Sequence, residues 1–194
     1  MKKTVALLCI LIYCSVINGV FAQENKVFRS IEDALSVSKD SVFHLNLSKQ
    51  KLTELPVEII TFTNLKTLDI SKNKLTILPQ EIEQLVFLEV FNAEKNDLTK
   101  FPIGVTNCKS LKIVNLGRNE IPKVPKEIEK LALLEKLDLW DNPLSDLPSS
   151  IRNLKLLKKL DLRGINFDKE IKNRIKSWLP NTNVFIDNSC DCGI

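Results

Sequence analysis

The sequence has few of the residues from which most catalytic and metal sites are built. Its 194 residues include a single histidine, His44, and no Gly-x-Ser-x-Gly, Gly-x-x-x-x-Gly-Lys-Ser/Thr or His-Glu-x-x-His motif. A lone surface histidine is far more often solvated than catalytic. These absences favour a non-enzymatic protein, so we expect no catalytic residue and no cofactor.

Cysteine is scarce, and its distribution argues against a disulfide framework. Of the five cysteines, Cys9 and Cys14 lie near the start, Cys108 lies mid-chain, and Cys190 and Cys192 lie near the end. Cys108 stands at a repeat position that elsewhere holds leucine, so we expect a small buried hydrophobe. Two terminal thiols and a distant histidine do not supply four zinc ligands, so no metal site is expected. The terminal thiols could bridge each other or cross-link two copies.

No apolar stretch has the roughly 20 residues that a bilayer crossing needs. Residues 1–22 begin with Lys2 and Lys3, continue as an interrupted apolar run to Val20, and end at Ala22. This is the layout of a secretory signal peptide, so we expect export to the periplasm, the cell surface or the medium, and no membrane span after cleavage. Loss of the two lysines lowers the formal net charge from +4 to +2, which gives no reason to invoke nucleic acid.

The sequence does contain one pattern that returns at a constant interval. The pattern of apolar, Asn and Pro positions in residues 65–87, LKTLDISKNKLTILPQEIEQLVF, returns every 23 residues without a gap. Two polar or rigid positions follow the same period, Asn73, Asn96, Asn119 and Asn142, and Pro56, Pro79, Pro102, Pro125 and Pro148. A fixed period of this length predicts a solenoid, in which each unit buries its apolar side against its neighbours.

The motifs LKTLDISKNKL and LEKLDLWDNPL, followed by LPxxIxxL, resemble the leucine-rich repeat family, in the 23-residue class of bacterial and Ras-group-related members. The resemblance implies an α/β fold. This fold is a right-handed solenoid, or horseshoe, with a parallel sheet on the concave face and short helices on the convex face. It implies little about function, because solenoids share a frame while their outward residues vary.

The repeat pattern also sets the expected boundaries: a signal peptide over 1–22, an N-terminal cap over 23–41, six repeats over 42–164, a C-terminal cap over 165–187 and a tail over 188–194. In the first cap, Ser30 and Asp33 have capping-box spacing, and Ile31, Ala34 and Leu35 share a helical face. In the second, we expect a helix that starts after Asp168 and stops at Pro180, then an edge strand over 183–187.

Within a repeat, the alternation predicts a short strand with Leu68 and Ile70 inward and Thr67, Asp69 and Ser71 outward. The asparagines are interpreted as structural, since their side chains can bond backbone groups left open by the turn. Each proline suits the first position of a short convex helix. The helix that precedes Pro180 includes Trp178, which we expect to pack in the core.

The outward residues form columns on the concave face. The middle column is Asn46, Asp69, Asn92, Asn115, Asp138 and Asp161; the next is Ser48, Ser71, Glu94, Gly117, Trp140 and Arg163; the strand exit holds Lys49, Lys72, Lys95, Arg118, Asp141 and Gly164. Trp140 near Arg163 has the composition of an interface anchor. The alternative, that Trp140 only packs over its neighbours, stays open. The candidate partner-binding residues are Trp140, Arg163, Arg118, Lys95, Glu94, Asp138 and Asp141.

We therefore expect an exported, monomeric binding module that holds a protein or peptide on its concave face. One alternative is glycan or envelope-polymer binding through the Asn/Asp column and Trp140. Another is an envelope scaffold cross-linked through Cys190 or Cys192. The basic run at the strand exits is a solvated edge or attracts an acidic partner or anionic glycan.

Overall fold

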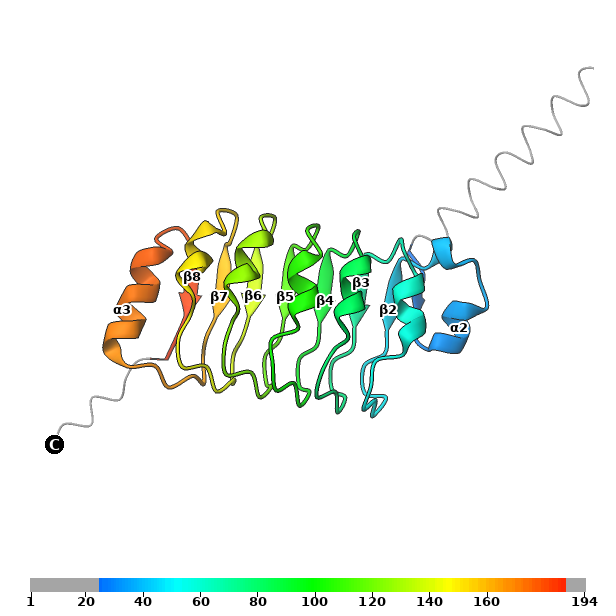
Figure 1. Ribbon diagram of the computed structural model, residues 1–194, viewed down its shortest axis with the longest axis horizontal. Coiled ribbons are helices and arrows are strands. Elements are labelled where there is room, and N and C mark those ends of the chain that lie inside the picture. Colours follow the sequence, from blue (N-terminus) through cyan, green and yellow to red (C-terminus); the bar gives the residue numbers. More distant parts are fainter. Residues whose placement is uncertain (1–24, 188–194) are drawn as a thin grey trace, which may run out of the picture.

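The computed structural model describes residues 25–187, so the expected signal peptide and the tail thiols lie outside the described residues. Parallel strands form one sheet in chain order, from β1 to β8. They are β1 (Val27–Phe28), β2 (His44–Asn46), β3 (Thr67–Asp69), β4 (Val90–Asn92), β5 (Ile113–Asn115), β6 (Lys136–Asp138), β7 (Lys159–Asp161) and β8 (Asn183–Phe185). Figure 1 shows them as a row with the helices stacked along one side. The fold is the expected solenoid.

Neighbouring strands pair residues that are 23 positions apart, which is the repeat period of the sequence. Leu45 pairs with Leu68, and Leu68 pairs with Phe91. Every inward position thereby meets its equivalent in the next repeat, and these side chains form one continuous core. Leu68 is 1% and Ile70 0% exposed, as predicted. Because each repeat buries its apolar residues only against its neighbours, stability is shared along the stack.

Short 3-10 helices cover the convex side of the repeats. They are η2 (Val57–Thr61), η3 (Gln80–Gln84), η4 (Ile103–Asn107), η5 (Lys126–Lys130) and η6 (Ser149–Asn153), after a single turn, η1 (Lys39–Ser41), near the N-terminus. The repeated proline is the N-cap of each, one position earlier than predicted. The Pro56 carbonyl accepts the first i→i+3 bond, from the Ile59 amide at 3.2 Å. This tighter bonding closes the helix in five residues, so the proline stands just outside it.

The repeated asparagines are buried and bond the backbone of two repeats, which confirms the structural interpretation. The Asn119 amide donates to the Ala93 carbonyl at 3.0 Å and the Leu116 carbonyl at 2.9 Å, and its oxygen accepts the Leu98 N–H at 3.1 Å. Cys108 is also buried, as predicted, and burial together with the charge of Glu83 raises its pKa to about 12. That thiol is therefore a core side chain.

One outward position is shielded from solvent. Ser71 follows strand β3 and lies in the same column as Glu94, but it is only 4% exposed. A short side chain on a concave surface is shielded by longer side chains in the adjacent repeats, so an outward direction does not ensure contact with solvent.

The N-terminal cap differs in part from the prediction. Helix α2 (Ile31–Leu35) has Ser30 as its N-cap. The Ser30 hydroxyl accepts a hydrogen bond from the Asp33 N–H at 3.1 Å, as the spacing predicts. Leu35, however, is 43% exposed, because a helix this short presents only Ala34 and part of Ile31 to the core. Strand β1 was not predicted. It covers the edge of β2 and buries Phe28, which removes an open strand edge.

The C-terminal cap closes the other end. As predicted, helix α3 (Lys169–Trp178) is capped by Asp168, whose carboxylate accepts the Ile171 N–H at 2.7 Å. The predicted edge strand is present as β8 and pairs with β7, but it ends at Phe185 and not at residue 187. Trp178 packs partly buried against the core. Within residues 25–187, no helix has the length and apolar character needed to cross a membrane.

Candidate binding site on the concave face

The strand exits share one backbone geometry. Lys49, Lys72, Lys95, Arg118, Asp141 and Gly164 all have positive φ angles, between 54° and 74°. A side chain in this left-handed region costs roughly 1–2 kcal/mol, and hydrogen bonds hold it there. For example, the Arg118 N–H donates to the Trp140 carbonyl at 2.8 Å. Because the backbone is the same at every exit, differences along the concave face come from side chains.

The Asn/Asp column is a structural feature that the sequence analysis treated only as surface. In each of the six repeats, a side-chain oxygen of the Asn or Asp accepts a hydrogen bond from the backbone N–H two residues later. For example, Asn46 accepts from the Ser48 N–H at 2.9 Å, and Asp138 accepts from the Trp140 N–H at 3.1 Å. The signal was present in the sequence, since no residue other than Asn or Asp occurs there. These oxygens stabilise the strand exit.

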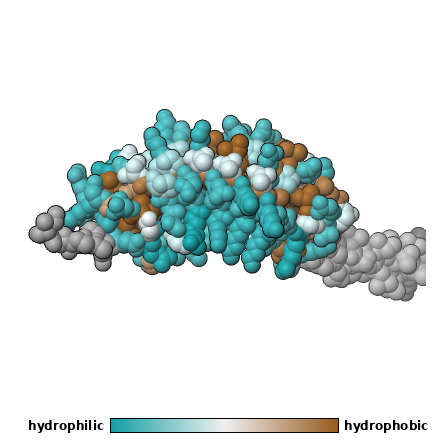
Figure 2. Space-filling view, turned by 90° about the horizontal axis from the view of Figure 1, so that it is seen from below, coloured by the Kyte–Doolittle hydropathy of each residue, from teal (hydrophilic) through white to brown (hydrophobic). Residues whose placement is uncertain are grey.

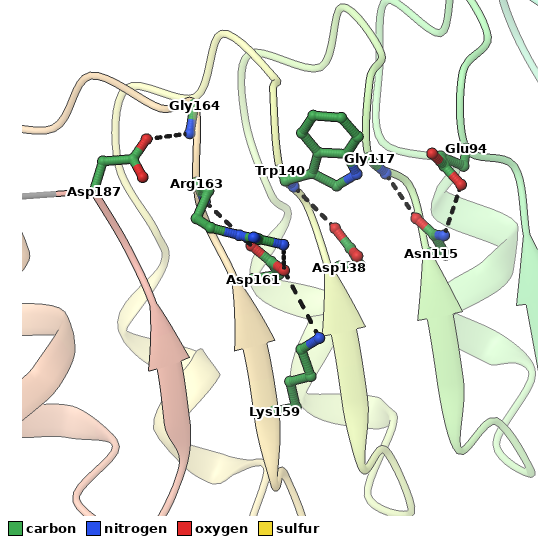
Figure 3. Close-up of polar contacts among 10 residues, drawn as sticks. All are labelled: Glu94, Asn115, Gly117, Asp138, Trp140, Lys159, Asp161, Arg163, Gly164 and Asp187. Atoms are coloured by element: carbon green, nitrogen blue, oxygen red, sulfur yellow. Dashed lines mark hydrogen bonds and ion pairs between the residues drawn. The ribbon is translucent and has the colours of Figure 1, made fainter.

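The Trp140 side chain packs against Gly117 of the preceding repeat (Figure 3). Its ring lies so close to Gly117 that a side chain there would collide with the indole. The Arg118 guanidinium lies 5.0 Å from the ring centroid, and Arg118 pairs with Asp141 at 3.4 Å. Trp140 is half-buried by these contacts. It therefore packs against its neighbours and still keeps part of its surface exposed.

Arg163 is fixed by a buried carboxylate that sequence analysis did not select. Its Nε donates to Asp161 Oδ1 at 2.8 Å and its Nη2 to Oδ2 at 2.6 Å, while Asp161 is 0% exposed. Burial opposes ionisation of Asp161, but the hydrogen bonds and charge of Arg163 outweigh it, so the pKa of Asp161 lies below its usual value. Lys159 adds a second cation at 3.8 Å. The guanidinium also lies 5.8 Å from the ring of Phe185.

A hollow opens between Trp140 and Arg163. It has a volume of about 390 Å³ and is lined by Trp140, Asp141, Arg163 and Gly164. Three features keep it open: Trp140 rests on Gly117, Arg163 folds back along its own strand to Asp161, and Gly164 has no side chain. We call it the Trp140 hollow.

The structure thus gathers part of the predicted site. Trp140, Asp141 and Arg163 line the hollow, and Arg118 borders it through Trp140 and Asp141. Glu94 and Lys95 do not line the hollow, because they lie in the repeat on the N-terminal side of Gly117. There Glu94 accepts a 3.4 Å hydrogen bond from the Asn115 side chain, and Lys95 is exposed. No group of three or more His, Cys, Asp or Glu side chains in the described part of the chain is placed to hold a metal ion.

Asp138 lies at the foot of this cluster, and burial raises its pKa from 3.8 to about 6. The negative charges of Asp161 and Glu94 add to this effect, while the hydrogen bond from the Trp140 N–H and the charge of Lys159 oppose it. Above pH 6 the folded protein therefore contains an ionised carboxylate that burial disfavours.

We expect Asp138→Asn to stabilise the protein at pH 8 by about 1 kcal/mol, after allowance for solvent screening. The amide oxygen can still accept the Trp140 N–H, as Asn115 accepts that of Gly117 in the preceding repeat. As pH rises from about 4 to about 6, the unfolded state ionises first and the native protein loses stability. Urea unfolding at several pH values should show a gain that grows over this range and is then constant. A gain independent of pH would contradict it.

Comparisons with known proteins agree with the geometry. Residues 64–85 and 133–154 match the family model described as Leucine Rich Repeat. A leucine-rich repeat protein of Leptospira interrogans is similar over 84% of this chain and 58% of its own, with 27% identity and a TM-score of 0.58. The plant peptide hormone receptor RGFR1, solved in complex with RGF2, is similar over 77% of this chain and 25% of its own, with 29% identity and a TM-score of 0.65.

Internalin C2 of Listeria monocytogenes is similar in fold, with 20% identity, a TM-score of 0.67 and coverage of 82% of this chain and 66% of the internalin. The chain spans less than two thirds of each of these three structures. No curated protein sequence matches it.

Proposed function

This chain is a leucine-rich repeat protein, and from that premise we propose that it is an exported, non-enzymatic module that binds a protein or peptide on its concave face. The signal-like pattern of residues 1–22 supports export. A solenoid similar to this one, the plant receptor RGFR1, was solved in complex with RGF2. Binding of a partner is therefore the activity that this frame supports best.

The observation that carries the proposal is the Trp140 hollow. Arg163 is held in place before any partner arrives by two hydrogen bonds to the buried Asp161, and Asp141 lies 3.4 Å from Arg118. Fixed side chains lose little conformational entropy on binding, so more of the contact energy contributes to affinity. Tryptophan and arginine in such settings commonly dominate binding energy.

The geometry favours a partner with one projecting apolar side chain and polar groups beside it. The apolar group would enter the 390 Å³ hollow against Trp140, while Arg163 and Asp141 would bond polar groups at its rim. A glycan partner is the second candidate. Each side chain of the Asn/Asp column uses one oxygen to accept a hydrogen bond from its own strand exit, and it keeps a second carboxylate oxygen or an amide NH₂ group that could bond a sugar hydroxyl.

Site-specific photo-crosslinking tests this proposal. A photoreactive phenylalanine analogue would replace exposed Lys95 on the concave rim, with exposed Lys109 on the convex side as the matched control. We expect the full-length protein, expressed in its own cells, to capture a partner from Lys95 and not from Lys109. Equal capture at both positions, or capture only at Lys109, would contradict concave-face binding.

A further inference from the structure

A second hollow lies on the flank of the solenoid, where the chain passes from the strand exits to the convex helices. Its volume is about 670 Å³, and residues of three successive repeats line it, from Lys100 to Ser149. We call it the flank groove. Phe101 and Val124, 7% and 0% exposed, form its floor, and Pro122 and Pro125 stand beside them. The groove is therefore apolar at its base and rigid at its sides.

The convex helices near the groove are unevenly spaced. Gly104 lets helix η4 approach η3, because a side chain there would collide with the Gln80 carbonyl and come within 2.8 Å of Ile82. Helix η4 packs more closely on η3 than on η5.

Three lysines surround the apolar floor. Lys100 and Lys123 stand at the same position in consecutive repeats, and Lys126 begins η5. Elsewhere the stack alternates charge at equivalent positions, so that Lys112 pairs with Glu89 and Lys158 with Glu135, both at 2.6 Å.

The three groove lysines, by contrast, form no ion pair with the described residues, although Glu127 also borders the groove. Lys100 and Lys123 lie in loops after strands β4 and β5, and Lys126 lies in η5. Positive charge gathered around one groove attracts an anionic ligand.

Exposed apolar side chains also occur on the flank toward the N-terminus, interspersed with polar ones. Ile77 occupies, one repeat earlier, the position of Lys100. Val57 and Ile103 occupy the position of Lys126 in earlier repeats, with Gln80 in the repeat between them. The three apolar side chains are 66%, 68% and 41% exposed. Figure 2, seen from the side of the strand exits, shows apolar patches on the convex side of an otherwise largely hydrophilic surface. Exposed apolar patches beside a charged groove mark interaction sites.

We propose that the flank groove is a second docking site, separate from the concave face, for a peptide segment that carries acidic residues next to an aromatic or aliphatic side chain. The carboxylates would meet Lys100, Lys123 and Lys126, and the apolar side chain would reach Phe101. The recessed floor favours a projecting side chain over a flat bilayer surface, because Phe101 and Val124 cannot protrude into a membrane.

A random peptide display library, selected against the folded mature protein, tests this proposal. Two variants separate its elements: Lys100→Glu with Lys123→Glu reverses the rim charge, and Ser149→Trp fills the groove without a change of charge. Lys109→Glu with Lys169→Glu is the matched control, since it makes the same change in net charge on exposed residues outside the groove. Circular dichroism would establish that each variant is folded.

We expect selected peptides rich in Asp, Glu and large apolar residues, whose affinity falls by about tenfold or more in both groove variants and little in the control. Peptides that lose affinity equally in the control would indicate general attraction to a basic surface and overturn the site. So would peptides that bind the Ser149→Trp variant normally. Binding to phosphatidylglycerol vesicles, lost in the groove variants without any peptide binding, would assign the groove to membranes instead.

Discussion

Asn119→Ala should lower the free energy of unfolding by about 3 kcal/mol, since several buried groups lose their partner at once. The Asn119 side chain bonds the carbonyls of Ala93 and Leu116 and the N–H of Leu98. These groups belong to two different repeats, and the side chain is 4% exposed. Urea unfolding should show a lower midpoint with the same dependence on denaturant concentration, because the folded surface is unchanged.

Gln50→Ala is the matched control for this prediction. Gln50 stands at the equivalent position of the first repeat, but it is exposed and its side chain makes one bond, to the Arg29 carbonyl at 2.6 Å. Its loss should cost less than about 1 kcal/mol. A similar loss of unfolding free energy in the two variants would show that the hydrogen bonds of Asn119 between repeats do not stabilise the protein. The apolar contacts alone would then account for its stability.

This asparagine illustrates why so much of the fold could be predicted from the sequence. A constant period forces equivalent residues into register, so one local motif specifies every strand pair between β2 and β7. The buried Asn is predictable in the same way, because its partners are backbone groups that every repeat supplies. Strand β1 was missed because two residues, Val27 and Phe28, are too few to show alternation. Its position follows from the open edge of β2.

The binding site was less predictable because it depends on side-chain orientation. The register does place Trp140 beside Gly117, so their contact could have been anticipated from the 23-residue spacing. The role of Asp161 could not, since its column contains Asn or Asp in every repeat and only the bonds to Arg163 distinguish it. The flank groove is lined by residues of three successive repeats whose side chains differ from one repeat to the next, so no periodic pattern records it.

Trp140→Ala should reduce capture of the partner at the Lys95 cross-linking position by about thirtyfold or more, if the indole is the anchor of the interface. Its effect on stability should be near 1 kcal/mol, because Trp140 is half-buried and loses only its seat on Gly117 and the contact with Arg118. Capture yield and thermal unfolding, measured on the same variant, separate binding from packing.

Trp178→Ala is the control, because the same change is made away from the concave face. Trp178 packs against the core on α3, with Arg152 and Arg174 5.9 and 5.5 Å from its ring. This variant should lose about 2 kcal/mol of stability and keep full capture. The opposite pattern, a large stability loss for Trp140→Ala with capture unchanged, would make Trp140 a packing residue. It would also remove the anchor on which concave-face recognition depends, while leaving the lysine-rimmed flank groove untouched.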